Sequence, residues 1–294
     1  MPRLFCVLML TLGIAPVLAA PRAAQADAFL TIAEAPGLGA FLADADGMTL
    51  YLFTPDTEPN ASACDGGCAQ AWPPLAPSDD LSLPAGVPGE LTTFDREDGA
   101  QQVAYNGIPL YSYADDAAPG DVNGEGAGGR WFVVPPGAMH GPYAAAPGEG
   151  TPPPKASVRI GFTEALGPFL IDPEGMTLYL FTEDTTAGES ACYDDCATAW
   201  PPVPATGSPV LPPGIPGTLA ETERTDGTTQ LMYNDIPLYL YAADTAPGDT
   251  NGQDVGEVWY IVPPGMQFGD EPHHGEEEEH EETEDAAGAT PASG

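Results

Sequence analysis

The sequence predicts an all-β protein built from two tandem modules of about seven short strands each, with a short cysteine-bearing helical turn in each module. Three observations support this prediction. Identical residues recur 128 positions apart, short apolar runs are divided by turn residues, and no long run has a helical period. The 35 glycines and 35 prolines supply many turns, and 294 residues are enough for about two domains.

The repeat predicts where the chain divides. Adding 128 to any position from Leu38 to Gly137 reaches the matching position of the second copy without an insertion or deletion. Identical pairs include Met48 and Met176, Cys64 and Cys192, Trp72 and Trp200, Asp98 and Asp226, Asn106 and Asn234, Asp121 and Asp249, and Trp131 and Trp259. The predicted parts are a signal peptide (1–26), a first module (27–142), a Pro-rich linker (143–157), a second module (158–268) and an acidic disordered tail (269–294).

Within each module we expect two three-stranded meanders followed by one last strand. In the first module the meanders cover residues 29–56 and 91–116, and the last strand covers 130–135. Asn106-Gly107 lies between two apolar runs and predicts a two-residue hairpin, because both residues tolerate positive φ. The second copy has Asn234-Asp235 at this turn, a weaker pair that still tolerates positive φ.

One motif, Tyr-x-(Phe/Tyr)-x-x-Asp, occurs four times. Residues i and i+2 of a strand share a face, so we expect each aromatic pair to pack in the interior. We expect the Asp to end the strand by accepting backbone N–H groups in an Asx turn; the alternative is that the four carboxylates gather as ligands. Truncating a ring should cost about 3–5 kcal/mol, and removing the Asp about 1 kcal/mol. The motif residues are Tyr51, Phe53, Asp56, Tyr111, Tyr113, Asp116, Tyr179, Phe181, Asp184, Tyr239, Tyr241 and Asp244.

The N-terminus has the features of a secretory signal peptide. Arg3 precedes a short apolar stretch, and small-residue cleavage patterns follow it. We expect Cys6 to be removed with this segment, and the mature chain to be exported to the periplasm or the extracellular space. No later segment has the length and apolar character of a transmembrane helix.

The four remaining cysteines form two Cys-x-x-x-Cys pairs. An oxidising compartment and the i, i+4 spacing predict the disulfides Cys64–Cys68 and Cys192–Cys196. We expect each disulfide to hold a Trp-Pro-Pro segment with its tryptophan, Trp72 or Trp200, packed inward. Ser62 and Ser190 are candidates to cap the short helical turn. Redox exchange and binding of a soft metal by free thiolates are the alternatives.

These motifs together resemble a known family. The four Tyr-x-aromatic-x-x-Asp motifs, "CDGGCAQAWPP" and "PLYSYADDAAPGDVNGEG" are similar to the secreted-repeat family of predicted lipoproteins with a Yx(FWY)xxD motif. The resemblance covers both modules and implies export, but it implies no established activity and no catalytic residues. Some members are associated with alkane use. This chain departs from the family pattern because it lacks a lipid-acceptor cysteine.

Two further groups of residues are candidate metal ligands. Asp121 and Asn123, with Asp249 and Asn251 in the second copy, have alternate spacing like that of a calcium loop, but the full loop and its distant Glu are missing. A tight loop is the favoured interpretation, and a divalent cation is the alternative. His273, His274 and His280 stand among the acids of the tail, where binding of Zn, Ni or Cu is the alternative to a solubilising role.

Charge and histidine content exclude several functions. The net charge of −37, from 44 acidic and 7 basic residues, repels nucleic acids and anionic lipids. His140 has Phe268 as its counterpart, so no Ser-His or Cys-His couple exists in both copies. We therefore expect an exported, non-catalytic binding or scaffold module without a cofactor, whose partner is an envelope protein or a cation. The alternatives are a metal-handling or redox accessory protein and, more weakly, a carboxylate-based enzyme or an accessory factor of hydrocarbon use.

Overall fold

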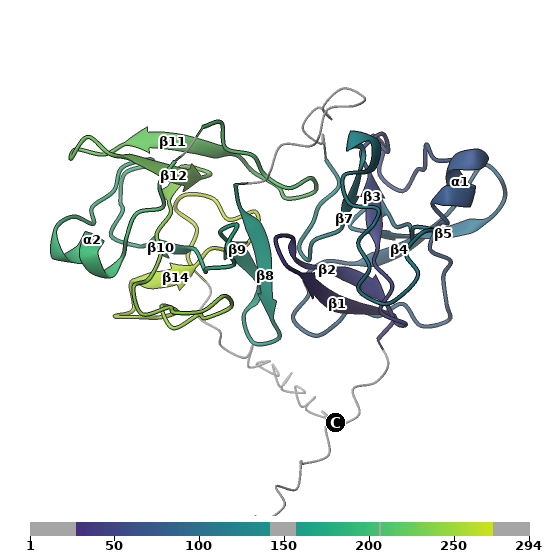
Figure 1. The fold of residues 1–294 in the computed structure, drawn as a ribbon, viewed down its shortest axis with the longest axis horizontal. Helices are drawn as coiled ribbons and strands as arrows, with labels where there is room; N and C mark the ends of the chain where they lie inside the picture. The colour runs from purple at the N-terminus through teal and green to yellow at the C-terminus, as the bar shows by residue number, and fades with distance from the viewer. Residues whose placement is uncertain (1–27, 142–156, 206, 273–294) are drawn as a thin grey trace, which may run out of the picture.

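The computed structural model describes residues 28–141, 157–205 and 207–272 (Figure 1). Each module contains seven strands and one short α-helix, as the sequence predicts. The first module consists of β1 (Leu30–Ala35), β2 (Gly39–Asp44), β3 (Tyr51–Phe53), α1 (Gly67–Ala71), β4 (Leu91–Asp95), β5 (Gln101–Tyr105), β6 (Ile108–Pro109), the 3₁₀ turn η1 (Ala127–Gly129) and β7 (Trp131–Val133). The second consists of β8 (Arg159–Thr163), β9 (Gly167–Ile171), β10 (Tyr179–Phe181), α2 (Asp195–Ala199), β11 (Leu219–Glu223), β12 (Thr229–Tyr233), β13 (Ile236–Pro237) and β14 (Trp259–Ile261).

The second expected meander is present, whereas the first is divided. Strands β4, β5 and β6 form an antiparallel three-stranded sheet. In the first half, Thr49 bridges to Ala43 of β2, but β3, which begins at Tyr51, pairs with β7. All three residues of β3 are buried, and its Tyr51 also bridges to Tyr111 of the second half. Strand β3 is therefore an interior strand that joins the two halves of the module.

The turn between β5 and β6 is the hairpin expected from Asn-Gly. Tyr105 pairs with Ile108, and the two turn residues have φ of 48° at Asn106 and 82° at Gly107. The second copy keeps this geometry, with φ of 49° at Asn234 and 65° at Asp235. The weaker Asn-Asp pair thus forms the same two-residue turn.

Each module contains two separate core clusters. One is mainly aliphatic and includes Leu42, Leu52 and Val103 in the first module. The other is aromatic and surrounds Tyr51, Trp72 and Trp131. The second module repeats both clusters with its own residues. Among the described residues, no helix has the length and apolar character needed to span a bilayer.

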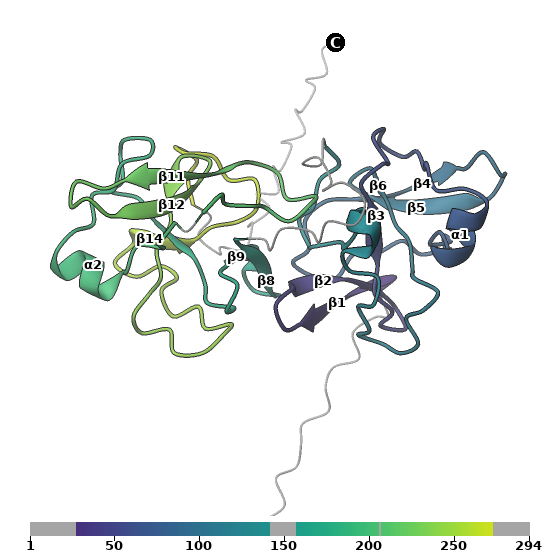
Figure 2. The same cartoon turned by 45° about the horizontal axis from the view of Figure 1, so that its top comes forward.

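The two modules meet along their N-terminal hairpins. Strands β2 and β8 run parallel and join the hairpins β1–β2 and β8–β9 into one four-stranded sheet. Gly39 makes this approach feasible, because a Cβ there would lie 2.4 Å from the carbonyl oxygen of Ile160. Figures 1 and 2 show the hairpins side by side in the middle of the molecule, with α1 and α2 at opposite outer ends.

We predict that each module folds without the other. The core clusters of each module are built almost entirely from its own residues, although Phe162 of β8 packs against the aliphatic core of the first module. Residues 27–147 and 155–265, expressed separately, should each unfold cooperatively in denaturant. Failure of both pieces to show a cooperative transition would contradict the division into two domains.

Candidate functional site

The tyrosines and aspartates of the repeated motif bind each other in exchanged pairs. The Tyr51 hydroxyl donates to Asp116 Oδ2 over 2.7 Å, and the Tyr111 hydroxyl donates to Asp56 Oδ2 over 2.7 Å. Each tyrosine therefore reaches the aspartate of the other half-repeat and not the one in its own motif. These reciprocal bonds tie the first half of the module to the second.

The second module repeats this exchange. Tyr179 donates to Asp244 and Tyr239 donates to Asp184, both over 2.7 Å. Because the same arrangement recurs in both copies, it is a property of the motif and not of one local sequence.

The second oxygen of each aspartate accepts a backbone N–H seven residues further along the chain. Asp56 Oδ1 accepts from Ala63 over 2.7 Å, and Asp116 Oδ1 accepts from Asn123 over 2.9 Å. The expected Asx turn is thus replaced by a longer loop closure, since the carboxylate points inward to its tyrosine. The four carboxylates have separate partners. Among the described residues, no group of three His, Cys, Asp or Glu side chains is placed to hold a metal ion.

The aromatic residues form a stack of four rings in the first module. Phe53 stacks on Trp131 with centroids 4.2 Å apart, Trp131 on Trp72 at 3.9 Å, and Trp72 on Tyr113 at 4.1 Å. Tyr51 meets Trp72 edge to face at 5.3 Å. Rings from the two half-repeats alternate along the stack, so it also joins the halves.

The second stack has the same order and nearly the same spacing. Its rings are Phe181, Trp259, Trp200 and Tyr241. The second aromatic residue of each motif, Phe53 and Tyr113 or Phe181 and Tyr241, forms an end ring of its stack. Tyr113, Phe181 and Tyr241 are only half-buried, so the expectation of interior packing holds fully for the first tyrosine of each motif and only in part for the second ring. A tyrosine hydroxyl in a packed stack needs a partner or contact with water, and that of Tyr113 donates to Asp115 at the exposed end.

Both expected disulfides are present. Cys64 bonds Cys68 and Cys192 bonds Cys196, each pair with Cα atoms 5.2 Å apart. Trp72 and Trp200 pack inward with 7% and 5% of their surface exposed, as expected. Since each disulfide begins at a fully buried cysteine in the aromatic core, it fixes the helical turn against the ring stack.

The expectation that Ser62 and Ser190 cap the helical turns is wrong. Helix α1 begins at Gly67, its cap is Gly66, and no side chain caps it. Ser62 lies too early in the chain, and its hydroxyl instead contacts Arg96 at 2.8 Å and Tyr111 at 2.7 Å. Ser190 makes the equivalent contacts with Arg224 and Tyr239.

We predict that peptide mapping under non-reducing conditions will find Cys64 linked to Cys68 and Cys192 linked to Cys196. Each bond closes a small loop, so reduction should cost only about 2 kcal/mol per module. Unfolding in denaturant with and without reductant measures this difference. Four free thiols, or a Cys64–Cys192 link, would contradict the role of the disulfide in holding the Trp-Pro-Pro segment.

A buried arginine supports each disulfide and was not anticipated. Arg96 donates to the Cys64 carbonyl over 2.6 Å and to Gln102 Oε1 over 2.6 Å, and it contacts Asp98 at 3.3 Å. Arg224 makes the same bonds in the second module. The sequence did carry a signal for it: four of the 7 basic residues lie in the modules, and among these four Arg96 and Arg224 alone occupy matching positions of the two copies.

Burial shifts the ionisation of the motif. Burial raises the pKa of Asp56 and of Asp184, although hydrogen bonds from backbone and tyrosine oppose the shift. Burial, together with the neighbouring aspartate, also raises the pKa of Tyr51 and of Tyr111. The tyrosines therefore stay protonated and act as hydrogen-bond donors to the carboxylates.

We predict that the free energy of unfolding falls as the pH rises from about 4, the ordinary pKa of an aspartate, towards about 8. A carboxyl whose pKa is raised by folding contributes stability that is present below the ordinary value, near 3.9, and is lost as the pH rises through the raised value. Hydrogen bonds lower the pKa of Asp98, Asp226 and Asp249. These carboxylates contribute stability above the ordinary pKa of an aspartate, and that contribution is lost only as the pH falls below it. Thermal unfolding across this range measures the effect.

High salt and a matched variant separate the buried carboxyls from general charge repulsion. Salt screens the repulsion within a chain of net charge −37, but it has less effect on the buried groups. Asp56→Asn with Asp184→Asn should reduce the pH dependence that remains in high salt, and Glu125 and Asp172, whose pKa burial also raises, should keep part of it. An unchanged slope in this double variant would contradict the assignment.

The candidate calcium loops use their polar groups internally. Asp121 Oδ2 accepts from the amides of Ala117 and Ala118 over 2.9 and 3.0 Å, and the Asn123 side chain donates to the Asp115 carbonyl. In the second copy, Asp249 accepts from two loop amides and Asn251 donates to Asp244. This geometry supports the loop interpretation. His273, His274 and His280 lie outside the described residues.

Comparison with known proteins identifies four repeats. A family model described as a secreted repeat of unknown function matches residues 35–76, 92–135, 162–204 and 221–263. Each matched segment contains one copy of the Tyr-x-aromatic-x-x-Asp motif, so the repeat unit is the half-module. No curated protein and no solved structure matches the chain.

Proposed function

The chain belongs to the family of secreted repeats of unknown function, and from this premise we propose that it is an exported, non-catalytic binding or scaffold module of the cell envelope. The observation that carries the proposal is the exchange of Tyr–Asp bonds between half-repeats. The first tyrosine and the aspartate of each motif use their side-chain polar groups to hold two repeats together. The motif thus acts as a construction element, and binding falls to the surfaces that differ between modules.

Metal handling is the competing function, and one set of measurements separates it from the proposal. Protein purified without a histidine tag should contain less than one metal ion per module, and titration should find no free thiols. Unfolding should be the same in calcium and in chelator, for the wild type and for Asp56→Ala alike. Stoichiometric metal, or an Asp56→Ala protein that gains stability in chelator and loses a calcium-dependent stabilisation, would refute the structural role of the motif.

A further inference from the structure

The second module carries a pocket of about 920 Å³ between the end of β10, β13 and the segment after β14. We propose that this pocket docks a basic segment of a partner protein, one that presents arginine or lysine side chains beside apolar ones. This inference rests on the proposed binding function and names the class of partner.

Part of the pocket floor is apolar, beside the polar Thr182 and the buried Asp184. Leu180, Ile236 and Met266 belong to the aliphatic core of the module, and the partly exposed Phe268 packs against that core. An aliphatic side chain placed here would therefore bury apolar surface on both partners.

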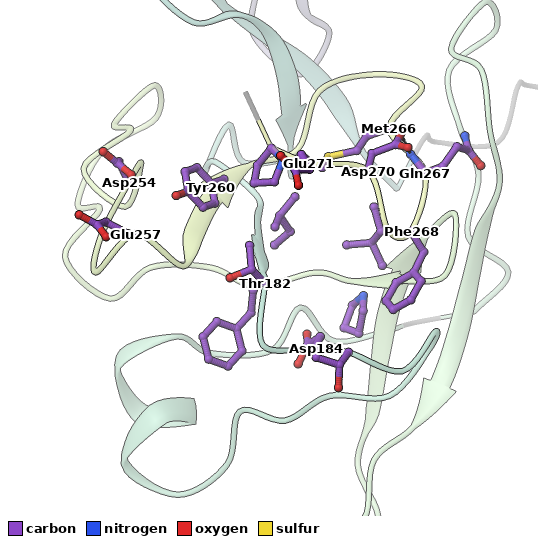
Figure 3. Close-up of a pocket in the computed structure, with 17 residues that line it drawn as sticks. Thr182, Asp184, Asp254, Glu257, Tyr260, Met266, Gln267, Phe268, Asp270 and Glu271 are labelled. Carbon is purple, nitrogen blue, oxygen red and sulfur yellow. Dashed lines mark hydrogen bonds between the residues drawn. The ribbon is translucent and has the colours of Figure 1, made fainter. Parts of the chain in front are cut away.

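The rim of the pocket is acidic. Asp254, Glu257, Asp270 and Glu271 are all exposed, and none of the described residues that line the pocket is Lys, Arg or His. Figure 3 shows Asp254 and Glu257 on one side, Asp270 and Glu271 along the top, and Phe268 opposite the first pair. The carboxylates thus lie on two sides of an apolar floor.

The acidic rim is specific to the second module. The counterparts of the four rim acids in the first module are Gly126, Gly129, Pro142 and Tyr143. Asp254 and Glu257 have φ of 61° and 59°, where Gly126 and Gly129 have 71° and 68°. Side chains other than glycine are disfavoured in this left-handed region. The second copy therefore retains two carboxylates at positions where the backbone favours glycine.

The volume of the pocket and the charge of its rim indicate which kind of molecule it binds. A pocket of this volume is far larger than a single metal ion requires, and its floor suits an aliphatic stem that ends in a cationic head. Acids on two sides match more than one cationic side chain, as a peptide segment provides. The chain's own residues after Pro272 include no Lys or Arg, so they do not supply the cationic side chains that the acidic rim favours.

A labelled hexapeptide of alternating arginine and leucine tests the proposal by fluorescence anisotropy with the full chain at low salt. The variant Asp254→Gly with Glu257→Gly installs the residues of the first module and should weaken binding about tenfold. Its unfolding midpoint should change little, because glycine suits both backbone positions and this gain offsets the lost contact between Asp254 and the Tyr260 hydroxyl. Asp254→Asn with Glu257→Gln removes the same charges with little change of shape and should weaken binding similarly.

The matched control is Asp194→Gly with Asp195→Gly. It also removes two carboxylates and also restores residues of the first module, Gly66 and Gly67, but it lies at α2 outside the pocket lining. Its affinity should stay within about twofold of the wild type.

Three results would overturn the proposal. The first is an equal loss of affinity in the pocket and control variants, which would mean attraction to net charge alone. The second is equal binding of a peptide with serine in place of leucine, which would mean that the floor is unused. The third is no binding of the arginine–leucine peptide at all. None of these results changes the metal, thiol and unfolding measurements that decide the proposed function.

Discussion

Trp72→Ala is expected to lower the free energy of unfolding of the first module by about 3–5 kcal/mol. The ring is 7% exposed and lies between Trp131 at 3.9 Å and Tyr113 at 4.1 Å. Its removal leaves a cavity in the middle of the four-ring stack. A Cβ on Gly124 would lie only 2.7 Å from the Trp72 ring, so the surrounding backbone is already close-packed and cannot simply collapse without rearrangement.

Chemical denaturation followed by circular dichroism measures this change. Trp200→Ala should have the same cost in the second module, because Trp200 occupies the same place in the second stack. Thr93→Ala, at an exposed position of β4, is the control and should change the free energy of unfolding by less than about 0.5 kcal/mol. A cost below about 1 kcal/mol for both tryptophans would show that the stacks are not the core of the modules.

The hairpins and disulfides of this fold could be predicted because residues close in sequence determine them. Asn106-Gly107 specifies a two-residue hairpin by its tolerance of positive φ, and the second copy forms the same hairpin. The disulfides follow from export and from the i, i+4 spacing of Cys64 and Cys68. In these cases the interacting residues are close in sequence, so no knowledge of the sheet topology is needed.

The pairing between half-repeats could not be predicted in this way. The motif places Tyr51 and Phe53 on one face of a strand, which is correct, but it does not say which aspartate that face meets. The partner of Tyr51 is 65 residues away at Asp116, and the two are adjacent because the backbone of Tyr51 pairs with that of Tyr111, five residues before Asp116. A repeat in which each tyrosine bonded its own aspartate would have the same sequence pattern.

The buried polar network has a similar explanation. Ser62 precedes a helical turn and is a good capping residue, so the local rule assigned it to the helix. Arg96 is buried in the folded module, so its guanidinium group needs hydrogen-bond acceptors there, and the sequence alone does not show that it is buried. It donates to the Ser62 hydroxyl, the Cys64 carbonyl and Gln102.

The same long-range pairing changes the expected cost of removing a motif aspartate. A simple turn aspartate would cost about 1 kcal/mol, but Asp56→Ala should cost about 2–4 kcal/mol. Asp56 is 1% exposed, and its removal takes acceptors from the Tyr111 hydroxyl and the Ala63 amide in the interior. Denaturant unfolding measures the cost, and Asp184→Ala should reproduce it in the second module.

Two double-mutant cycles identify the partner of Asp56. The cycle of Asp56→Ala with Tyr111→Phe should give a coupling of about 1.5–3 kcal/mol, because each change removes one side of the same charge-assisted bond. The matched cycle of Asp56→Ala with Tyr51→Phe stays within one motif and should give less than about 0.5 kcal/mol, because Tyr51 bonds Asp116. The reverse order of the two couplings would mean that the motif closes on itself, and that the two halves of the module are joined by apolar packing alone.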